Sequence, residues 1–214
     1  MSNKNDISQK EAVLSGVEEG VIEAIKLVPG FNILIGGIKK YEAHIENQQR
    51  ELFLVALTNR IADIEQHFQN DWYKTPEAEE FVKKTVASAL NAEYADKVDF
   101  FANMLINSKE DLKQMERMKF LELVRQLSKP ALVVLDVATK LYKKRGTGHS
   151  PQMDDPTTKR YIITETGFEQ LLVDACVSEL LSLGVFSSEG FRPSVRGYTS
   201  FTLKFFNFIS DPSE

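Results

Sequence analysis

The side chains most able to bind a metal or act as nucleophiles are three histidines, His44, His67 and His149, and one cysteine, Cys176. The histidines lie in three separate parts of the chain and show no metal-binding spacing. Asp63 and His67 share a helix face at i, i+4, which supplies either half of a metal site or a surface hydrogen bond. We favour the hydrogen bond, and we expect no bound metal and no cofactor.

Motifs typical of enzymes are missing from the sequence. It has no phosphate-binding loop, no nucleophile elbow and no Cys-x-x-Cys pair. The acid pairs Glu79-Glu80 and Asp154-Asp155 are adjacent rather than facing, so we interpret them as solvated. Cys176 has no neighbour in sequence that would lower the pKa of its thiol, and we interpret it as a small buried hydrophobe. We therefore expect no catalytic residue and no enzyme activity.

Composition limits the other classes of function. The chain has 214 residues, 43% of them hydrophobic, which is enough for the core of one large or two small domains. Its net charge is -5. Residues 128–214 carry ten basic and ten acidic side chains, and residues 1–127 carry 16 and 21. Neither part is basic overall, so the totals do not favour electrostatic binding to nucleic acid.

Targeting signals are also missing. The first ten residues lack the layout of a signal peptide. The longest apolar run, residues 27–38, is shorter than the about 20 residues that span a bilayer. A single cysteine permits no intramolecular disulfide and fits a reducing compartment. These features together predict a cytoplasmic protein.

A Pro-Gly corner at residues 27–31 leads into the longest regular pattern of the chain. The apolar residues that follow recur at steps of three and four, which predicts one very long helix that ends near residue 68. They are Leu34, Ile38, Tyr41, Ile45, Leu54, Leu57, Ile61, Ile64 and Phe68. Such a helix needs other helices along it, and Thr75-Pro76 is a strong start for the next one. We predict a disordered tail over residues 1–10 and a helical bundle over residues 11–127.

The corner and the lysines behind it form the first candidate contact surface. A glycine-rich apolar turn flanked by cations could enter a membrane interface or meet a partner protein. The residues concerned are Phe31, Ile33, Leu34, Ile35, Lys39 and Lys40. The alternative is that the corner packs on the long helix as part of the core, with its lysines in water. We favour packing in the core.

Residues 128–210 follow a different order of elements. Ser128 before Pro130 indicates a helix start, and residues 145–158 contain the turn formers typical of a mobile loop. The elements expected next are a short strand at Tyr161–Thr164, a helix at Thr166–Leu183, a left-handed cap at Gly184, a hairpin, and a helix capped by Ser200. Helix, glycine cap, hairpin and helix in this order predict a winged-helix-like module.

A winged helix binds DNA when its recognition helix enters the major groove. Basic and amide side chains on that helix contact phosphates and base edges. The helix expected here instead carries or adjoins four acids, Glu165, Glu169, Asp174 and Glu179. The candidate nucleic-acid contacts are the cations that follow it, Arg192, Arg196 and Lys204. We therefore favour a protein contact or a purely structural role for the module.

Three phrases of the sequence, taken in order, point to a known family. The first covers residues 95–108, the second residues 120–136, and the third combines residues 181–186 with 198–205. Together they resemble the bacterial abortive-infection alpha family and related helical proteins with a winged-helix-like end. The resemblance covers about residues 90–210. Thr202 departs from it, since a glycine usually follows the wing. The resemblance implies a role in anti-phage defence, without catalytic residues.

The sequence thus predicts a mainly α-helical protein with two parts, a bundle built on one long helix and a small winged-helix-like α+β module. As function we expect a non-enzymatic interaction protein of a bacterial or phage-encoded defence or toxin-type system, which binds a protein partner or itself. Two alternatives stay open. The first is a winged-helix DNA-binding transcriptional regulator, and the second is an effector that perturbs membrane interfaces through residues 27–40, by peripheral contact.

Overall fold

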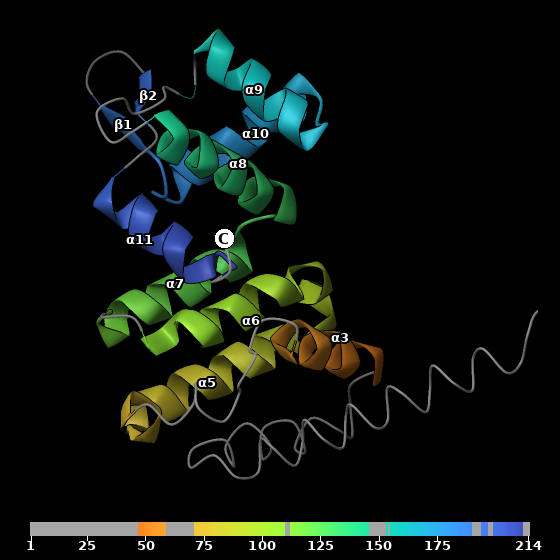
Figure 1. Ribbon diagram of the computed structural model, residues 1–214, viewed down its shortest axis with the longest axis vertical. Coiled ribbons are helices and arrows are strands. Elements are labelled where there is room, and N and C mark those ends of the chain that lie inside the picture. The colour runs from red at the N-terminus through yellow and green to blue at the C-terminus, as the bar shows by residue number, and fades with distance from the viewer. Residues whose placement is uncertain are drawn as a thin grey trace, which may run out of the picture. The chain divides into compact units, whose positions relative to one another are not determined.

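The described part of the chain is mainly α-helical, as the sequence predicts (Figure 1). The computed structural model describes residues 47–58, 71–109, 112–145, 153, 155–189, 194–196 and 199–211. The described residues form two compact units, one up to Gln114 and one from Met115 to Ser210, and Asp211 belongs with the first. This division falls one helix before the domain boundary expected at residue 128.

The first unit packs its helices around α6. Its elements are α3 (Asn47–Thr58), η1 (Asp71–Lys74), α5 (Pro76–Ala89), η2 (Ala92–Lys97), α6 (Val98–Ile106) and η3 (Asn107–Lys109). Both α3 and α5 contact α6. The largest fully buried side chains between them are Phe53, Leu57, Phe81 and Phe101. Of the long helix expected up to residue 68, the structure describes residues 47–58 as α3, and the corner at residues 27–31 lies outside the described residues.

Local capping determines where α5 begins. The Oγ1 of Thr75 accepts a hydrogen bond from the Ala78 amide at 3.2 Å, and Pro76 occupies the first helical position. The predicted helix start is therefore confirmed. Tyr73, just before it, donates from its hydroxyl to the Leu105 carbonyl at 2.7 Å, which fastens η1 to the end of α6.

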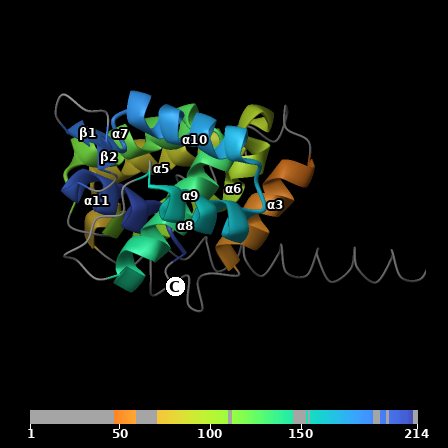
Figure 2. The same cartoon turned by 90° about the horizontal axis from the view of Figure 1, so that it is seen from above.

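The second unit places three helices around α8. Its elements are α7 (Gln114–Gln126), α8 (Lys129–Arg145), α9 (Pro156–Thr166), α10 (Gln170–Ser182), β1 (Ser187–Glu189), β2 (Ser194–Arg196) and α11 (Ser200–Ile209). The helices α9, α10 and α11 all contact α8, and α9 and α10 also contact each other (Figures 1 and 2). The strands β1 and β2 form an antiparallel hairpin in which Ser188 lies opposite Val195.

One predicted element is wrong. Tyr161–Thr164, expected as a short strand, lies inside the helix α9. The start signal of this helix is Asp155, whose carboxylate accepts a hydrogen bond from the Thr158 amide at 2.9 Å, followed by Pro156 at the first helical position. The β-branched residues of α9 are tolerated because Thr158 and Ile162, one turn apart, are both buried.

Glycines end the helices α9 and α10, and a pair of threonines caps the start of α11. Gly167 (φ 69°) ends α9, so the helix expected from Thr166 begins only at Gln170. Gly184 (φ 72°) has the predicted left-handed conformation after α10. The last helix is capped by Thr199, not Ser200, through a reciprocal pair of hydrogen bonds with Thr202.

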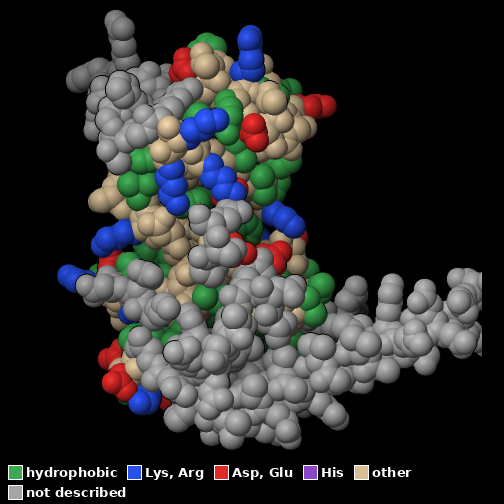
Figure 3. Space-filling model, viewed as in Figure 1, with side chains coloured by type: hydrophobic (Ala, Val, Ile, Leu, Met, Phe, Trp, Pro, Cys, Tyr) green, Lys and Arg blue, Asp and Glu red, His purple; other side chains and the backbone are tan. Residues whose placement is uncertain are grey.

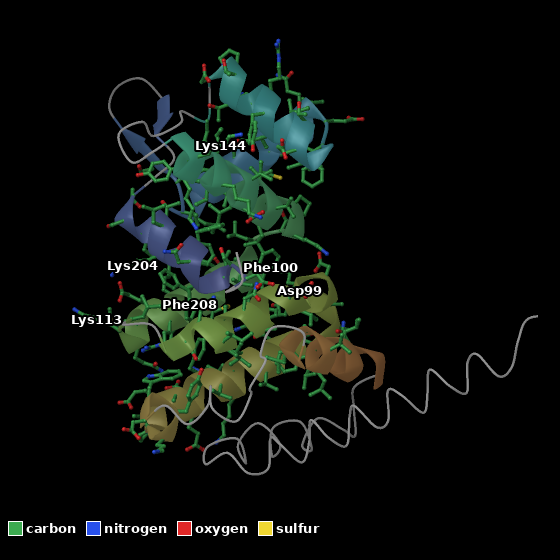
Figure 4. The ribbon with its side chains drawn as sticks, in the orientation of Figure 1. Asp99, Phe100, Lys113, Lys144, Lys204 and Phe208 are labelled. Carbon is green, nitrogen blue, oxygen red and sulfur yellow. The ribbon has the colours of Figure 1, made fainter. Side chains whose placement is uncertain are left out.

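Aromatic side chains join α7 to α11 in the core of the second unit. The ring of Phe120 on α7 lies 5.3 Å, 5.3 Å and 5.5 Å from the rings of Phe201, Phe205 and Phe208 on α11, measured between centroids. Figure 4 labels Phe208 on α11. Phe120, Phe205 and Phe208 are fully buried, so this cluster fixes the last helix to the first of the unit.

Candidate functional site

The outer side of α10 is apolar or uncharged and faces solvent. Leu171 is 82% exposed and Leu172, next to it, 40%. Three further exposed residues continue the stripe at helical spacing, Ala175, Ser178 and Ser182. We call these five residues the α10 face. The opposite side of the helix packs into the unit through Val173, Cys176, Val177 and Leu180. In Figure 2, α10 lies along the upper edge of the view, with α8 and α9 to one side of it.

The serines of the α10 face are already hydrogen-bonded within the helix. Ser178 donates from its Oγ to the Asp174 carbonyl, and Ser182 to the Glu179 carbonyl, each at 2.8 Å. A hydroxyl that is bonded in this way loses less when water is removed from it. The α10 face can therefore be covered by another protein without leaving these donors unsatisfied.

Two of the four acids expected to repel DNA are engaged inside the second unit. Asp174 forms an ion pair with Lys159 of α9, with 2.5 Å between Nζ and Oδ1. Glu179 accepts hydrogen bonds from the amide and the hydroxyl of Ser128 at the start of α8. The other two are exposed: Glu165 lies on α9, and Glu169 directly precedes α10. The prediction of exposed acids on and beside this helix is therefore confirmed for Glu165 and Glu169, whereas Asp174 and Glu179 are partly buried.

The residues predicted as contacts are distributed as follows. Phe31, Ile33, Leu34, Ile35, Lys39 and Lys40 lie outside the described residues, as does Arg192. Arg196 ends β2, and only its backbone is described. Lys204 is exposed on α11, and its Nζ lies 2.9 Å from a carboxylate oxygen of Glu116 on α7 (Figure 4). An exposed pair of this kind contributes little stability, but it reduces the net positive charge around Lys204.

A cluster of cations near the end of α8 was missed by counting charges over the whole module. Lys140, Lys143 and Lys144 lie in the last two turns of the helix, and Arg145 follows them. No acidic residue occurs in the sequence between Asp136 and Asp154. Figure 3 shows Lys and Arg side chains gathered over α8 on the side that faces the viewer. The signal in the sequence for this cluster was the local run of basic residues, which the equal totals of basic and acidic residues in the module conceal.

Cys176 is 2% exposed and lies on the inner side of α10. Burial raises the pKa of its thiol above the ordinary value of 9.0, and the nearby charge of Glu179 raises the pKa further. A thiol with a raised pKa is a poor nucleophile at neutral pH, which agrees with a structural role. Over the described ranges, no group of three or more His, Cys, Asp or Glu side chains is placed to hold a metal ion.

Comparisons of this chain with family models, curated proteins and solved structures give no match. None of the helices that the structure describes is both long and apolar enough to cross a membrane.

Proposed function

We propose that the protein acts by binding another protein through the α10 face. The observation that carries this proposal is the exposure of Leu171 and Leu172 in the first turn of a helix whose opposite side packs into the unit. Leucines this exposed are among the few large apolar side chains that the described residues leave in water. An apolar group of this kind, bordered by polar residues, is typical of an interaction surface.

The shape of the α10 face favours a helical partner. Beyond the two leucines, the stripe consists of alanine and serine, and small side chains allow a second helix to approach closely. Covering each leucine would contribute at most about 1.5–3 kcal/mol. A stable interface usually buries about 800 Å² on each partner, which is more than two leucines can supply. The leucines would therefore form the centre of the interface and the neighbouring residues its rim.

We further propose that the second unit is a winged-helix-like module used for protein contact. The order α8, α9, α10, hairpin and α11 supports this assignment. DNA readout, the alternative use of such a module, receives less support, because α10 contains no arginine and no lysine. Recognition helices contact bases and phosphates mainly through these cations and amide side chains.

The biological setting that we propose is anti-phage defence or a related toxin-type system. It rests on the resemblance of residues 90–210 to the abortive-infection alpha family. In this setting, the partner bound by the α10 face would be a phage protein or a second component of the host system, and the protein itself would act without catalysis.

A plating assay tests the proposal. Bacteria that express the wild-type protein are challenged with a panel of phages, and the efficiency of plating is compared with that of cells expressing Leu171→Ser/Leu172→Ser. Met115→Ser is the matched control, because Met115 is 84% exposed but lies on α7. We expect protection from the wild type and the control and loss of protection in the double variant, at equal protein levels. Equal protection by all three would exclude the α10 face, and no protection by the wild type against any phage would contradict the proposed setting.

A further inference from the structure

Lys143 and Lys144, near the end of α8, differ from six other lysines in the described part of the chain, each of which is paired with an acid. Lys83 and Lys84 on α5 are also adjacent, but each is paired with a glutamate one turn earlier, at 2.5 Å from Glu79 and 2.7 Å from Glu80. Lys74, Lys140, Lys159 and Lys204 also have carboxylate partners within 3.2 Å. The charge of these lysines is thus balanced locally.

Lys143 and Lys144 have no such balance. One turn earlier the helix offers Thr139 and Lys140 instead of acids, and no carboxylate of a described residue forms an ion pair with either lysine. Both lysines are exposed. Cations in the last turn also interact favourably with the helix dipole, but that effect is worth only about 0.3–1 kcal/mol and leaves their outer surface free.

A contact with α11 fixes one of the two side chains. The Nζ of Lys143 lies over the ring of Phe206, 4.8 Å from its centroid. This cation–π contact gives the ammonium group a defined place without neutralising it. Lys144 extends from α8 near its C-terminal end (Figure 4). Together the two lysines present adjacent, uncompensated positive charges on a protein whose net charge is -5.

We propose that Lys143 and Lys144 form a binding surface for the phosphate backbone of nucleic acid, independent of base sequence. A duplex carries a phosphate charge about every 1.7 Å along its axis, so adjacent lysines can contact neighbouring phosphates. An anionic membrane is the less suitable ligand. Of the described apolar residues beside the lysines, Ala138 and Leu141 are buried and Tyr142 is only partly exposed, which leaves little apolar surface to enter a lipid interface.

This surface is separate from the α10 face. It would provide affinity for nucleic acid without readout of base sequence, since phosphate contacts carry no sequence information. The proposal of a protein contact and the proposal of a phosphate contact can therefore be refuted independently, because different substitutions test them.

Fluorescence anisotropy with labelled random-sequence DNA and RNA, single- and double-stranded, tests the proposal on the full-length chain. For the wild type we expect binding whose affinity falls steeply between about 50 and 200 mM salt. Lys143→Ala/Lys144→Ala should weaken duplex binding roughly ten- to hundredfold at 0.1 M salt and lower the slope of log K against log salt by about 1.8. Lys83→Ala/Lys84→Ala, the matched control, should bind like the wild type.

Two further measurements keep the outcome decisive. Lys144→Glu leaves the contact of Lys143 with Phe206 in place and should weaken binding to a similar extent as the double alanine variant, while circular dichroism shows unchanged helicity. Sedimentation with vesicles of anionic lipid, at the same salt concentration, tests whether the lysines bind lipid headgroups instead of nucleic acid. Absence of oligonucleotide binding by the wild type, equal losses in the two double variants, or binding to vesicles alone would each overturn the proposal.

Discussion

Glu179 of α10 accepts two hydrogen bonds from Ser128, which lies 51 residues earlier in the chain. Its Oε1 lies 2.5 Å from the Ser128 amide nitrogen and its Oε2 lies 2.7 Å from the hydroxyl. The same hydroxyl accepts a weaker bond from the Ala131 amide at 3.3 Å, so it caps α8 while it is held by α10. This contact fixes two helices of the second unit and turns one acid of α10 away from the outer surface.

Removal of this carboxylate should destabilise the second unit. Glu179→Ala leaves the Ser128 amide and hydroxyl without their acceptor in a partly buried position, and we expect a loss of about 1–3 kcal/mol in the free energy of unfolding. Urea denaturation followed by circular dichroism measures this loss. Glu165→Ala, an exposed acid on α9, is the control and should change stability by less than about 0.5 kcal/mol. Equal effects of the two substitutions would contradict this role of Glu179.

Phe120 should be the side chain whose loss costs the second unit most. It is fully buried and contacts three aromatic rings of α11. Phe120→Ala would leave a cavity among them, and we expect destabilisation by about 3–5 kcal/mol. Met115→Ala on the same helix should have little effect, because Met115 is largely exposed. A small effect of Phe120→Ala in thermal or urea unfolding would show that α11 is held by other contacts.

Gly184 should tolerate substitution poorly for a conformational reason alone. No atom lies within 4 Å of a Cβ built at this position, so space is available, but its φ of 72° is unfavourable for residues with a side chain. We expect Gly184→Ala to lower the free energy of unfolding by about 1–2 kcal/mol. Gly184→Asn should lower it less, because asparagine visits this conformation more readily. An unchanged stability in Gly184→Ala would mean that the turn can change its conformation.

Stability should fall at alkaline pH through Cys176. The pKa of its thiol is raised in the folded protein, first by burial and then by the charge of Glu179, above its ordinary value of 9.0. The unfolded chain therefore loses the thiol proton first as the pH rises. The contribution of the protonated thiol is complete below about pH 9 and decreases above it. Urea titrations from neutral to alkaline pH should show a smaller decrease for Cys176→Ala than for the wild type, and equal slopes would refute the assignment.

Local signals in the sequence were sufficient for much of the helical fold. Thr75-Pro76 and Gly184 specify a helix start and a helix end through their own conformations, and both were predicted correctly. The strand expected at Tyr161–Thr164 failed because β-branched residues favour strands on average. Here the helix is favoured instead, because Asp155 caps its first turn and because one side of the helix is buried.

The candidate surfaces depended on contacts that spacing along the chain does not reveal. Asp174 and Glu179 were expected on the outer surface of the helix, yet their partners lie 15 and 51 residues away in the sequence. Only the packing of α8, α9 and α10 brings these pairs together and partly buries the two acids. The unpaired lysines of α8 became apparent in the same way, since the charge total of the module conceals them.

Site-specific photo-crosslinking tests the central claim, that the α10 face binds a protein partner, most directly. A photoreactive amino acid is introduced in place of Leu171, or in place of the equally exposed Met115, and cells are irradiated with and without phage infection. We predict a discrete crosslinked protein from position 171 and none from position 115, and mass spectrometry would identify the partner. The same crosslinks from both positions, or none from position 171 under either condition, would contradict the claim.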